Sequence, residues 1–322
     1  MLAVMTTARF HTVNPCASGA FHVVSRCVRQ AWLCGHDPAT GRDLSHRKRR
    51  VEERIVALAA QFAIGVYAYA VMNNHVHLVV RTAPELVDTW SDLDVLRRWF
   101  SVSRRKDDTD ASIEQRALAA SGNAERIAEY RRRLGNLSWF MRFLNESIAR
   151  AANAEDGCKG RFWEGRFHCQ ALLDDAAVLS AMTYVDLNPV RAKVVTAPEA
   201  AQHVSVRRRT EQAKARRDAI EPLAPVVGPG VVLGVSEREY LLLVDETGRR
   251  LHTDKPGAID RALPSIVRRI GLSENAWLLQ VQGTQSRYWR AIGLVDALVD
   301  KAVELQQRWL KGVMFARRLK VV

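Results

Sequence analysis

Two histidines in a strand-like segment are the first residues that could do chemistry. Residues 71–80 read VMNNHVHLVV, so one valine separates His75 from His77. Side chains alternate between the two faces along a β-strand, and both imidazoles are therefore expected on one face. Neutral imidazole is a good ligand for divalent metals, and two on one face can share an ion. The alternative is a histidine pair that only forms hydrogen bonds at a sheet edge, and this motif alone does not decide between the two.

A tyrosine and an asparagine form a second candidate group in the segment MTYVDLNPVRA, residues 182–192. Tyr184 and Asn188 are four residues apart, so on a helix they share a face, whereas Asp186 points elsewhere. Asn188 offers a carboxamide oxygen that could complete a metal site. A tyrosine hydroxyl beside a metal-held phosphate can attack it and leave a covalent phosphotyrosine. The alternative is a core tyrosine that lies near the end of a helix.

A third segment alternates arginines with aromatic residues. Residues 160–167 read GRFWEGRF, in which Arg161, Trp163 and Arg166 are candidate DNA-binding residues. Arginine can clamp phosphates, and aromatic rings can stack on unpaired bases. A packed aromatic loop with exposed arginines is the competing interpretation.

The elements that must position these residues follow from the spacing of apolar side chains. Segments 21–28 and 65–81 have the composition of strands, the second with a polar break before the histidines. Apolar residues at helical spacing predict helices over residues 46–64, over 138–153 with Ser138 as N-cap, and over 172–190 from about Asp175.

The composition changes near residue 200. A basic run followed by prolines and glycines, residues 206–230, is the best candidate for a linker. We therefore expect one domain over residues 1–205, with a charged helical insertion at 88–133, and a small helical domain over 231–322. In the latter, Ser236 and Glu239 form a capping box and residues 291–310 predict a long amphipathic helix.

Charge and hydropathy narrow the class of partner. The 322 residues contain 48 Lys and Arg against 35 Asp and Glu, a net charge of +13, which favours a polyanion such as DNA. No apolar run is long enough to cross a bilayer, and the N-terminus lacks the pattern of a signal peptide, so we expect a cytoplasmic, nucleoid-associated protein.

Five cysteines without a CxxC pair predict reduced thiols. A zinc site at Cys27, Cys34 and His36 is conceivable, but the spacing fits no familiar pattern.

Taken in order, four motifs resemble those of a known family. NNHVHLVV, GRFWEGRF, LLDDAAVL and YVDLNPVRA are similar to motifs of the single-tyrosine HUH transposases, and closest to the REP-associated tyrosine transposases, relatives of insertion-sequence transposases. Each motif is modest alone, but the ordered set is specific. The resemblance covers roughly residues 15–200 and does not extend to residues 230–322.

This resemblance implies both a fold and a reaction. The fold would be α+β, a ferredoxin-like antiparallel sheet with helices. By position, His75 and His77 would be metal ligands for Mg²⁺ or Mn²⁺, Tyr184 the nucleophile, and Asn188 the third ligand, where relatives often have glutamine. The activity would be cleavage and rejoining of single-stranded or hairpin DNA through a 5′-phosphotyrosine, in transposition or REP-type repeat processing. Some relatives are homodimers with the tyrosine supplied in trans, and others are monomers.

Two other classes of function remain as alternatives. One is a domesticated, non-catalytic protein that binds DNA hairpins and regulates. The HxH motif also occurs in cupin-like oxygenases, but these predict a β-barrel of evenly spaced strands, which the helical segments contradict. No GxxxxGK[ST] loop appears, in keeping with a reaction that needs no nucleotide hydrolysis.

Overall fold

The computed structural model describes residues 17–28, 33–37, 41–196, 198–215, 221–251, 262–270, 272–286 and 289–319. Within these residues the fold is α+β, the class that the family resemblance implied. Its centre is a five-stranded sheet in the order β2-β3-β1-β4-β7, and a separate short ribbon joins β5 and β6. The strands are β1 (Gly19–Arg26), β2 (Ile64–Val71), β3 (His75–Thr82), β4 (His168–Leu172), β5 (Pro222–Leu223), β6 (Leu233–Ser236) and β7 (Ala291–Ile292).

Antiparallel pairing holds the first four strands together. β3 lies between β2 and β1, and β1 pairs in turn with β4, whereas β7 runs parallel to β4. β2 reads IGVYAYAV, a continuous apolar run, and all its residues are buried. Such a run is expected where helices cover both faces of a sheet.

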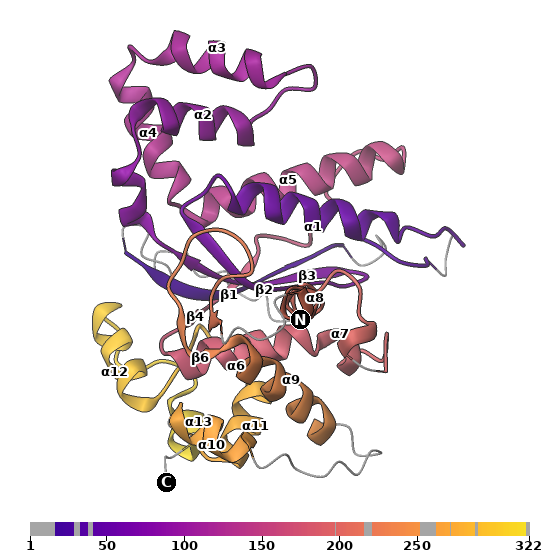
Figure 1. Ribbon diagram of the computed structural model, residues 1–322, viewed down its shortest axis with the longest axis vertical. Helices are drawn as coiled ribbons and strands as arrows, with labels where there is room; N and C mark the ends of the chain where they lie inside the picture. Colours follow the sequence, from indigo (N-terminus) through magenta and orange to yellow (C-terminus); the bar gives the residue numbers. More distant parts are fainter. Residues whose placement is uncertain are drawn as a thin grey trace.

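Helices form a layer on each face of this sheet (Figure 1). One face carries α1 (His46–Ala59) and α5 (Leu137–Glu155), and the other carries α6 (Asp175–Asp186), with α7 (Asn188–Arg191) directly after it. The apolar stripe predicted for α1 is confirmed, since Val51, Ile55 and Leu58 are buried. Two hydrophobic cores result, one between α1, α5 and the sheet, the other between α6 and the sheet.

Capping residues fix where α5 and α6 begin. Asp174 is the N-cap of α6, and its carboxylate accepts a hydrogen bond from the backbone N–H of Ala177 at 2.7 Å. The prediction of Ser138 as the cap of α5 is wrong. Asn136 takes that position, and its side-chain oxygen accepts from the backbone N–H groups of Ser138 and Trp139. The helix therefore begins a little earlier because an asparagine carbonyl satisfies these otherwise unpaired donors.

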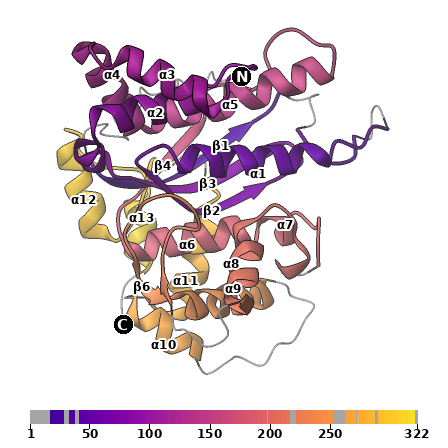
Figure 2. The same ribbon diagram turned by 45° about the horizontal axis from the view of Figure 1, so that its top comes forward.

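The charged insertion forms helices, as predicted. The 3₁₀ helix η2 (Pro84–Thr89) leads into α2 (Asp92–Val102), α3 (Asp110–Ala120) and α4 (Ala124–Leu134). Trp99 of α2 and Tyr130 of α4 stack with ring centroids 4.4 Å apart. These helices extend the α1–α5 layer away from the sheet (Figures 1 and 2).

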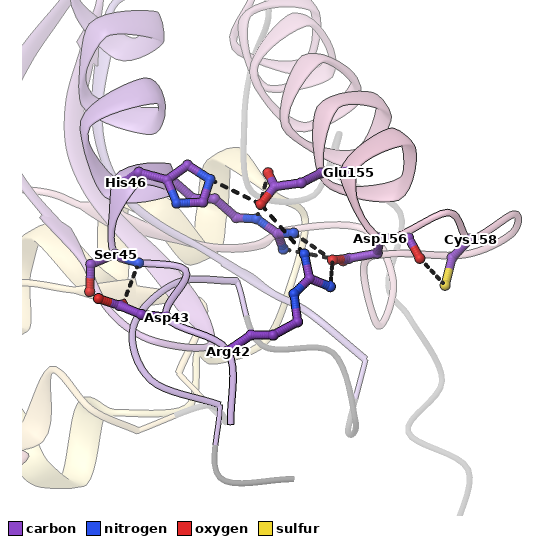
Figure 3. Close-up of polar contacts among 8 residues, drawn as sticks. Arg42, Asp43, Ser45, His46, Glu155, Asp156 and Cys158 are labelled. Atoms are coloured by element: carbon purple, nitrogen blue, oxygen red, sulfur yellow. Dashed lines mark hydrogen bonds and ion pairs between the residues drawn. The ribbon is translucent and has the colours of Figure 1, made fainter. Parts of the chain in front are cut away.

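Ion pairs attach the start of α1 to the end of α5. Glu155 and Asp156 face Arg42 and His46 in Figure 3, with His46 Nε2 3.0 Å from Glu155 and Arg42 Nη1 3.0 Å from Asp156. Arg47, which is nearly buried, contacts both carboxylates, at 3.1 and 2.6 Å. Arg47 of the basic run HRKRR is thus ion-paired inside the molecule, whereas His46 is paired at the surface.

Many of the described residues after 200 pack in the core that contains α6, whereas Leu298 and Ala302 of α12 belong to the core that contains α1 and α5. The elements there are η3 (Pro198–Ala200), α8 (Ser205–Ala215), α9 (Glu237–Leu251), α10 (Ala262–Arg269), α11 (Glu274–Gly283), α12 (Val295–Glu304), α13 (Val313–Ala316) and η4 (Arg317–Leu319). Trp277 of α11 and Tyr240 of α9 are fully buried in the core that contains α6. Figure 2 shows α8, α9 and α11 on the α6 side of the sheet. The division into domains at 206–230 stays a prediction.

Three expectations about this region can be compared with the structure. The capping box before α9 is confirmed, since the Ser236 backbone N–H donates to Glu239 at 2.8 Å and the Glu239 N–H donates to Ser236 Oγ at 3.2 Å. The start of the proposed linker is helical, because α8 occupies it. The long helix over 291–310 is wrong: Ala291 and Ile292 pair with β4, and α12 covers only Val295–Glu304. None of the described helices combines the length and apolar character that a bilayer crossing requires.

Candidate active site

The two predicted histidines lie at the wall of one cavity. His75 and His77 stand opposite Arg26 and Val24 in the β1–β3 register, so all four side chains are on the same face of the sheet. The histidine ring centroids are 4.7 Å apart. The cavity has a volume of about 510 Å³ and is also lined by His22, His168, Gln170, Tyr184, Asn188 and Arg191, among others; we call it the central cavity.

A chain of hydrogen bonds orients His77. The Gln170 side-chain N–H donates to the backbone oxygen of Ser286 at 2.6 Å. The Gln170 side-chain oxygen therefore faces His22 and accepts from His22 Nδ1–H at 2.8 Å. His22 Nε2 then carries a lone pair and accepts from His77 Nδ1–H at 2.9 Å. This network assigns the remaining lone pair of His77 to Nε2, which lies 3.3 Å from the Asn188 amide nitrogen.

A single hydrogen bond gives His75 the same tautomer as His77, with the proton on Nδ1. Its Nδ1 lies 2.6 Å from the side-chain oxygen of Asn74, which can only accept, so Nδ1 carries the proton and Nε2 the lone pair. Asn74 belongs to the polar break that the sequence places before β3. Both histidines therefore present Nε2 as an electron-pair donor.

Burial keeps the deeper histidines neutral. It lowers the pKa of His22 to about 4, against a smaller opposing effect of the Gln170 hydrogen bond. Burial likewise holds the pKa of His77 well below its usual value, with further lowering by the neighbouring His22 and His75. Desolvation disfavours the imidazolium form, so both rings are neutral at pH 7. Neutral imidazole is the form that can bind a metal ion.

Tyr184 and Asn188 reach the central cavity from the other side. Both come from the α6–α7 segment that crosses this face of the sheet, and the shared helical face predicted from their spacing is confirmed. The Tyr184 ring centroid lies 5.7 Å from that of His77 and 5.8 Å from that of His22, edge-on in both cases. Asp186 points away from the cavity, as expected, and is fully buried.

An arginine that the sequence motif contains but does not single out faces Tyr184. The Arg191 guanidinium lies 5.1 Å from the Tyr184 ring centroid. Its Nη2 donates to the side-chain oxygen of Gln285 at 2.9 Å, whereas its buried Nη1 has no hydrogen-bond partner among the described residues. A buried N–H group that is not satisfied by the protein is suited to an anionic ligand in the cavity.

The arginine-aromatic segment is divided between two roles. Arg166 and Glu164 line the central cavity, but Arg161 and Trp163 do not. Arg161 is exposed and donates from Nε to the backbone oxygen of Trp163 at 2.9 Å. Trp163 is half-buried, packs against the α1–α5 core and donates its indole N–H to the Asn145 backbone oxygen at 2.8 Å. These contacts correspond to the packed-loop interpretation for Trp163 and leave Arg166 as the residue of the three that faces the cavity.

Two imidazoles and one carboxamide at the cavity could hold a divalent cation, but they would not enclose it. Within the described residues, no three His, Cys, Asp or Glu side chains are grouped so as to hold a metal ion, which gives no support to a zinc site at Cys27, Cys34 and His36. Two imidazole Nε2 atoms and the Asn188 carboxamide are the nearest set. A cation bound there would need water or a substrate phosphate as additional ligands, which is the usual situation for Mg²⁺ and Mn²⁺.

Sequence reasoning missed the residues that support this set. His22 lies in a segment that was interpreted only as a strand, and Arg191 lies near a predicted helix end. Gln170 lies between the segments 160–167 and 172–190, where no element was predicted. The signal for His22 is a histidine at an inward position of a buried strand, FHVV, and the signal for Arg191 is its place seven residues, or about two helical turns, after Tyr184. For Gln285 and Ser286, which close the cavity from beyond α11, we find no sequence signal.

Comparisons with known proteins add one similarity. No protein-family model matches the chain, and no curated protein sequence does. Among solved structures, a REP-associated tyrosine transposase bound to a REP hairpin is similar at 13% sequence identity and a TM-score of 0.39, over 71% of this chain and 93% of that one. Neither value is high enough to transfer residue roles or activity.

Proposed function

We propose that this protein is a metal-dependent DNA strand transferase that cleaves and rejoins single-stranded or hairpin DNA with Tyr184 as nucleophile. One observation carries the proposal. Tyr184 and Asn188 on one helical face meet His75 and His77 on one strand face, although the two segments are more than a hundred residues apart in the chain. Pure binding requires none of these four side chains.

The arrangement of the elements supports an HUH-type core. β1, α1, β2, β3, α5 and β4 follow one another as strand, helix, two strands, helix and strand, interrupted by the insertion that holds α2 to α4. The sheet order β2-β3-β1-β4, with α1 and α5 on one face, is that of a ferredoxin-like βαββαβ unit. In such a unit β1 and β3 are central strands, which is where the histidines lie.

His75, His77 and Asn188 would hold the cation, Mg²⁺ or Mn²⁺. When bound, it supplies stabilisation of negative charge on the scissile phosphate. For Asn188 this requires its carboxamide to turn its oxygen toward the cavity in place of the N–H that now faces His77 Nε2. An amide can be rotated in this way within the same space.

The protein's own residues account for the rest of the reaction. The Tyr184 oxygen attacks phosphorus and its hydroxyl proton is released to solvent, the bond from phosphorus to the 3′ oxygen breaks, and that oxygen takes up a proton from solvent to become a free 3′-OH, so no net proton is gained or lost. The 5′ end stays joined to Tyr184 as a phosphotyrosine, so the phosphodiester energy is kept for rejoining. Arg191 and Arg166 lie at the cavity wall to stabilise the negative charge of the phosphate.

A denaturing gel with labelled single-stranded DNA tests the proposal. The wild-type protein should form a covalent adduct in Mg²⁺ or Mn²⁺, and Tyr184→Phe should bind the same DNA without forming one. Tyr69→Phe is the matched control, because Tyr69 is fully buried and hydrogen-bonded to Glu52 on the far side of the sheet. If Tyr184→Phe still traps DNA, the nucleophile is a different residue.

A hairpin-binding regulator is the second candidate. One observation favours it: both ring nitrogens of His77 are engaged by His22 and Asn188, which is also what a purely structural histidine would show. This candidate predicts tight hairpin binding by the wild-type protein with no adduct under any metal condition. The same gel distinguishes the two.

A further inference from the structure

A second polar depression lies on the far side of the β2–β3 turn from the central cavity. Its main part, about 460 Å³, is bounded by the start of α1 and by α8, and an adjoining part of about 270 Å³ shares Gln202 and His203 with it. We call this depression the basic groove and define it by Lys48, Arg49, His203, Arg207 and Arg208. The groove crosses the sheet edge, because β2 is an edge strand and residues 203–204 pair with it there.

Several cationic side chains of the basic groove have no ion-pair partner among the described residues. Arg207 is paired with Glu211, and the Glu52 carboxylate accepts hydrogen bonds from Tyr69 and from His203. Lys48, Arg49 and Arg208 form no ion pair with any described residue. This contrasts with Arg47 and His46 in the same basic run, which Glu155 and Asp156 neutralise (Figure 3).

Helical geometry explains why side chains of the basic run HRKRR lie on two different faces of α1. Successive residues of a helix are rotated by about 100°, so Arg47 can face α5 while Arg49 faces the opposite direction. Arg49 shares its face with Glu52, three residues on, and both line the groove. Lys48 lines the adjoining part of the groove, as does Asn73 of the β2–β3 turn.

The basic groove and the central cavity are lined by neighbouring residues of the same two segments. Asn188 lines the cavity, and its neighbour Pro189 lines the adjoining part of the groove. The β2–β3 turn is shared in the same way, with His75 on the cavity side and Asn73 on the groove side. A chain that leaves the cavity past α7 therefore meets Lys48 first and the arginines of α1 and α8 next.

We propose that the basic groove binds the sugar-phosphate backbone of the nucleic-acid strand that leaves the central cavity. This rests on the proposed function in that DNA occupies the cavity. Among the described residues no Phe, Tyr or Trp side chain lines either part of the groove, so apart from the His203 imidazole it offers cations for phosphates rather than rings for stacking bases. Contact of this kind is independent of sequence and depends strongly on salt.

The test measures binding of labelled single strands by fluorescence anisotropy in EDTA, so that no cleavage occurs. The test variant is Arg49→Gln with Arg208→Gln. Its matched control is Arg105→Gln with Lys106→Gln, which removes the same charge from an exposed loop between α2 and α3, in the layer across the sheet from α8. Strands of about 8 and about 30 nucleotides are compared over a series of salt concentrations.

The groove variant should bind the longer strand roughly 10- to 30-fold more weakly near 0.1 M salt, with a salt slope lower by about 1.4, as expected for two lost phosphate contacts. The loss should be smaller for the short strand, and the control variant should match the wild type. Equal effects in the groove and control variants, or a wild-type protein that binds neither strand, would overturn the proposal.

Two further measurements keep the result interpretable. If Arg208→Gln lowers the melting temperature, Lys48→Gln with Arg49→Gln, both on α1, replaces it and should reduce the slope by a similar amount. A wild-type protein that forms no covalent adduct, while the groove variant still loses long-strand affinity, would refute strand transfer and leave the groove intact. If the wild-type protein forms the adduct but the groove variant binds the long strand as tightly as the wild type, strand transfer stands and the groove proposal is refuted.

Discussion

Tyr240 on α9 donates a hydrogen bond from its hydroxyl group to the Asp186 carboxylate on α6, with the two oxygens 2.6 Å apart. Both side chains are fully buried. Ser205 and the backbone N–H of Val206, at the start of α8, donate to the other carboxylate oxygen. Asp186 lies between Tyr184 and Asn188 in the sequence, so this buried network ties α8 and α9 to the helix that carries the candidate nucleophile.

Removal of the Tyr240 hydroxyl group should destabilise the protein. In Tyr240→Phe a buried acceptor loses its donor, which typically costs about 1–3 kcal/mol when the acceptor is charged. Tyr67→Phe is the control, because the Tyr67 hydroxyl donates to a neutral acceptor, the backbone oxygen of Val231, at 2.6 Å. Urea unfolding should show a larger loss for Tyr240→Phe. An equal loss would mean that the Asp186 contact has no special weight.

Stability should depend on pH through Asp186. Burial raises its pKa to about 6, and the hydrogen bonds from Ser205 and Tyr240 only partly offset this. A carboxyl whose folded pKa is raised binds its proton more tightly in the folded state, so its contribution is present below about pH 4 and is lost as pH rises to about 6. The free energy of unfolding of the wild type, relative to Asp186→Asn, should fall by roughly 2–3 kcal/mol over that range. A flat difference would contradict the raised pKa.

Metal binding should require the half-buried His75 as well as the buried His77. His75→Ala should keep its fold, because His75 lies at the cavity edge, but should lose uptake of Mn²⁺ in calorimetric titration and lose adduct formation. EDTA should abolish adduct formation by the wild type, and added Mg²⁺ or Mn²⁺ should restore it. His46→Ala removes an exposed histidine on α1 and should bind Mn²⁺ normally. Full activity in His75→Ala would refute the metal site.

Arg191 should contribute to the chemical step. If its unpaired Nη1 contacts the phosphate, Arg191→Gln should slow adduct formation by about 10²-fold, the scale for the loss of one stabilising donor. Gln285→Ala keeps the guanidinium but removes its partner at 2.9 Å, and should cause a smaller loss. Single-turnover kinetics on a saturating oligonucleotide measure both. An unchanged rate in Arg191→Gln would leave its role structural.

Trp163 and Arg166 should respond differently to substitution. Trp163→Phe loses the indole hydrogen bond to Asn145 and should cost about 1 kcal/mol of stability without changing the affinity for DNA. Arg166→Gln, at the cavity wall, should weaken DNA binding without changing the melting temperature. Reduced DNA affinity in a fully folded Trp163→Phe protein would restore the original expectation that this ring stacks on a base.

Local periodicity determined much of this site. Alternation along a strand placed His75 and His77 on one face, and helical spacing placed Tyr184 and Asn188 on another, because both patterns are fixed by backbone geometry over a few residues. The caps of α6 and α9 were likewise readable, since the capping residue lies next to the helix it begins. The α+β class was implied by the ordered set of motifs and their family resemblance.

Tertiary structure alone decided which partners these residues have. His22 reaches Gln170 across 148 positions of sequence, and Gln170 reaches Ser286 across another 116. Residues 291–292 join the sheet although their segment has the apolar spacing of a helix. Strand register and the packing of distant helices depend on contacts between remote parts of the chain, and no local period encodes the identity of a remote partner. The sequence thus predicts the chemical groups and their faces, whereas the tautomers of the histidines, the role of Arg191 and the closure of the cavity by the C-terminal residues arise only when the chain is folded.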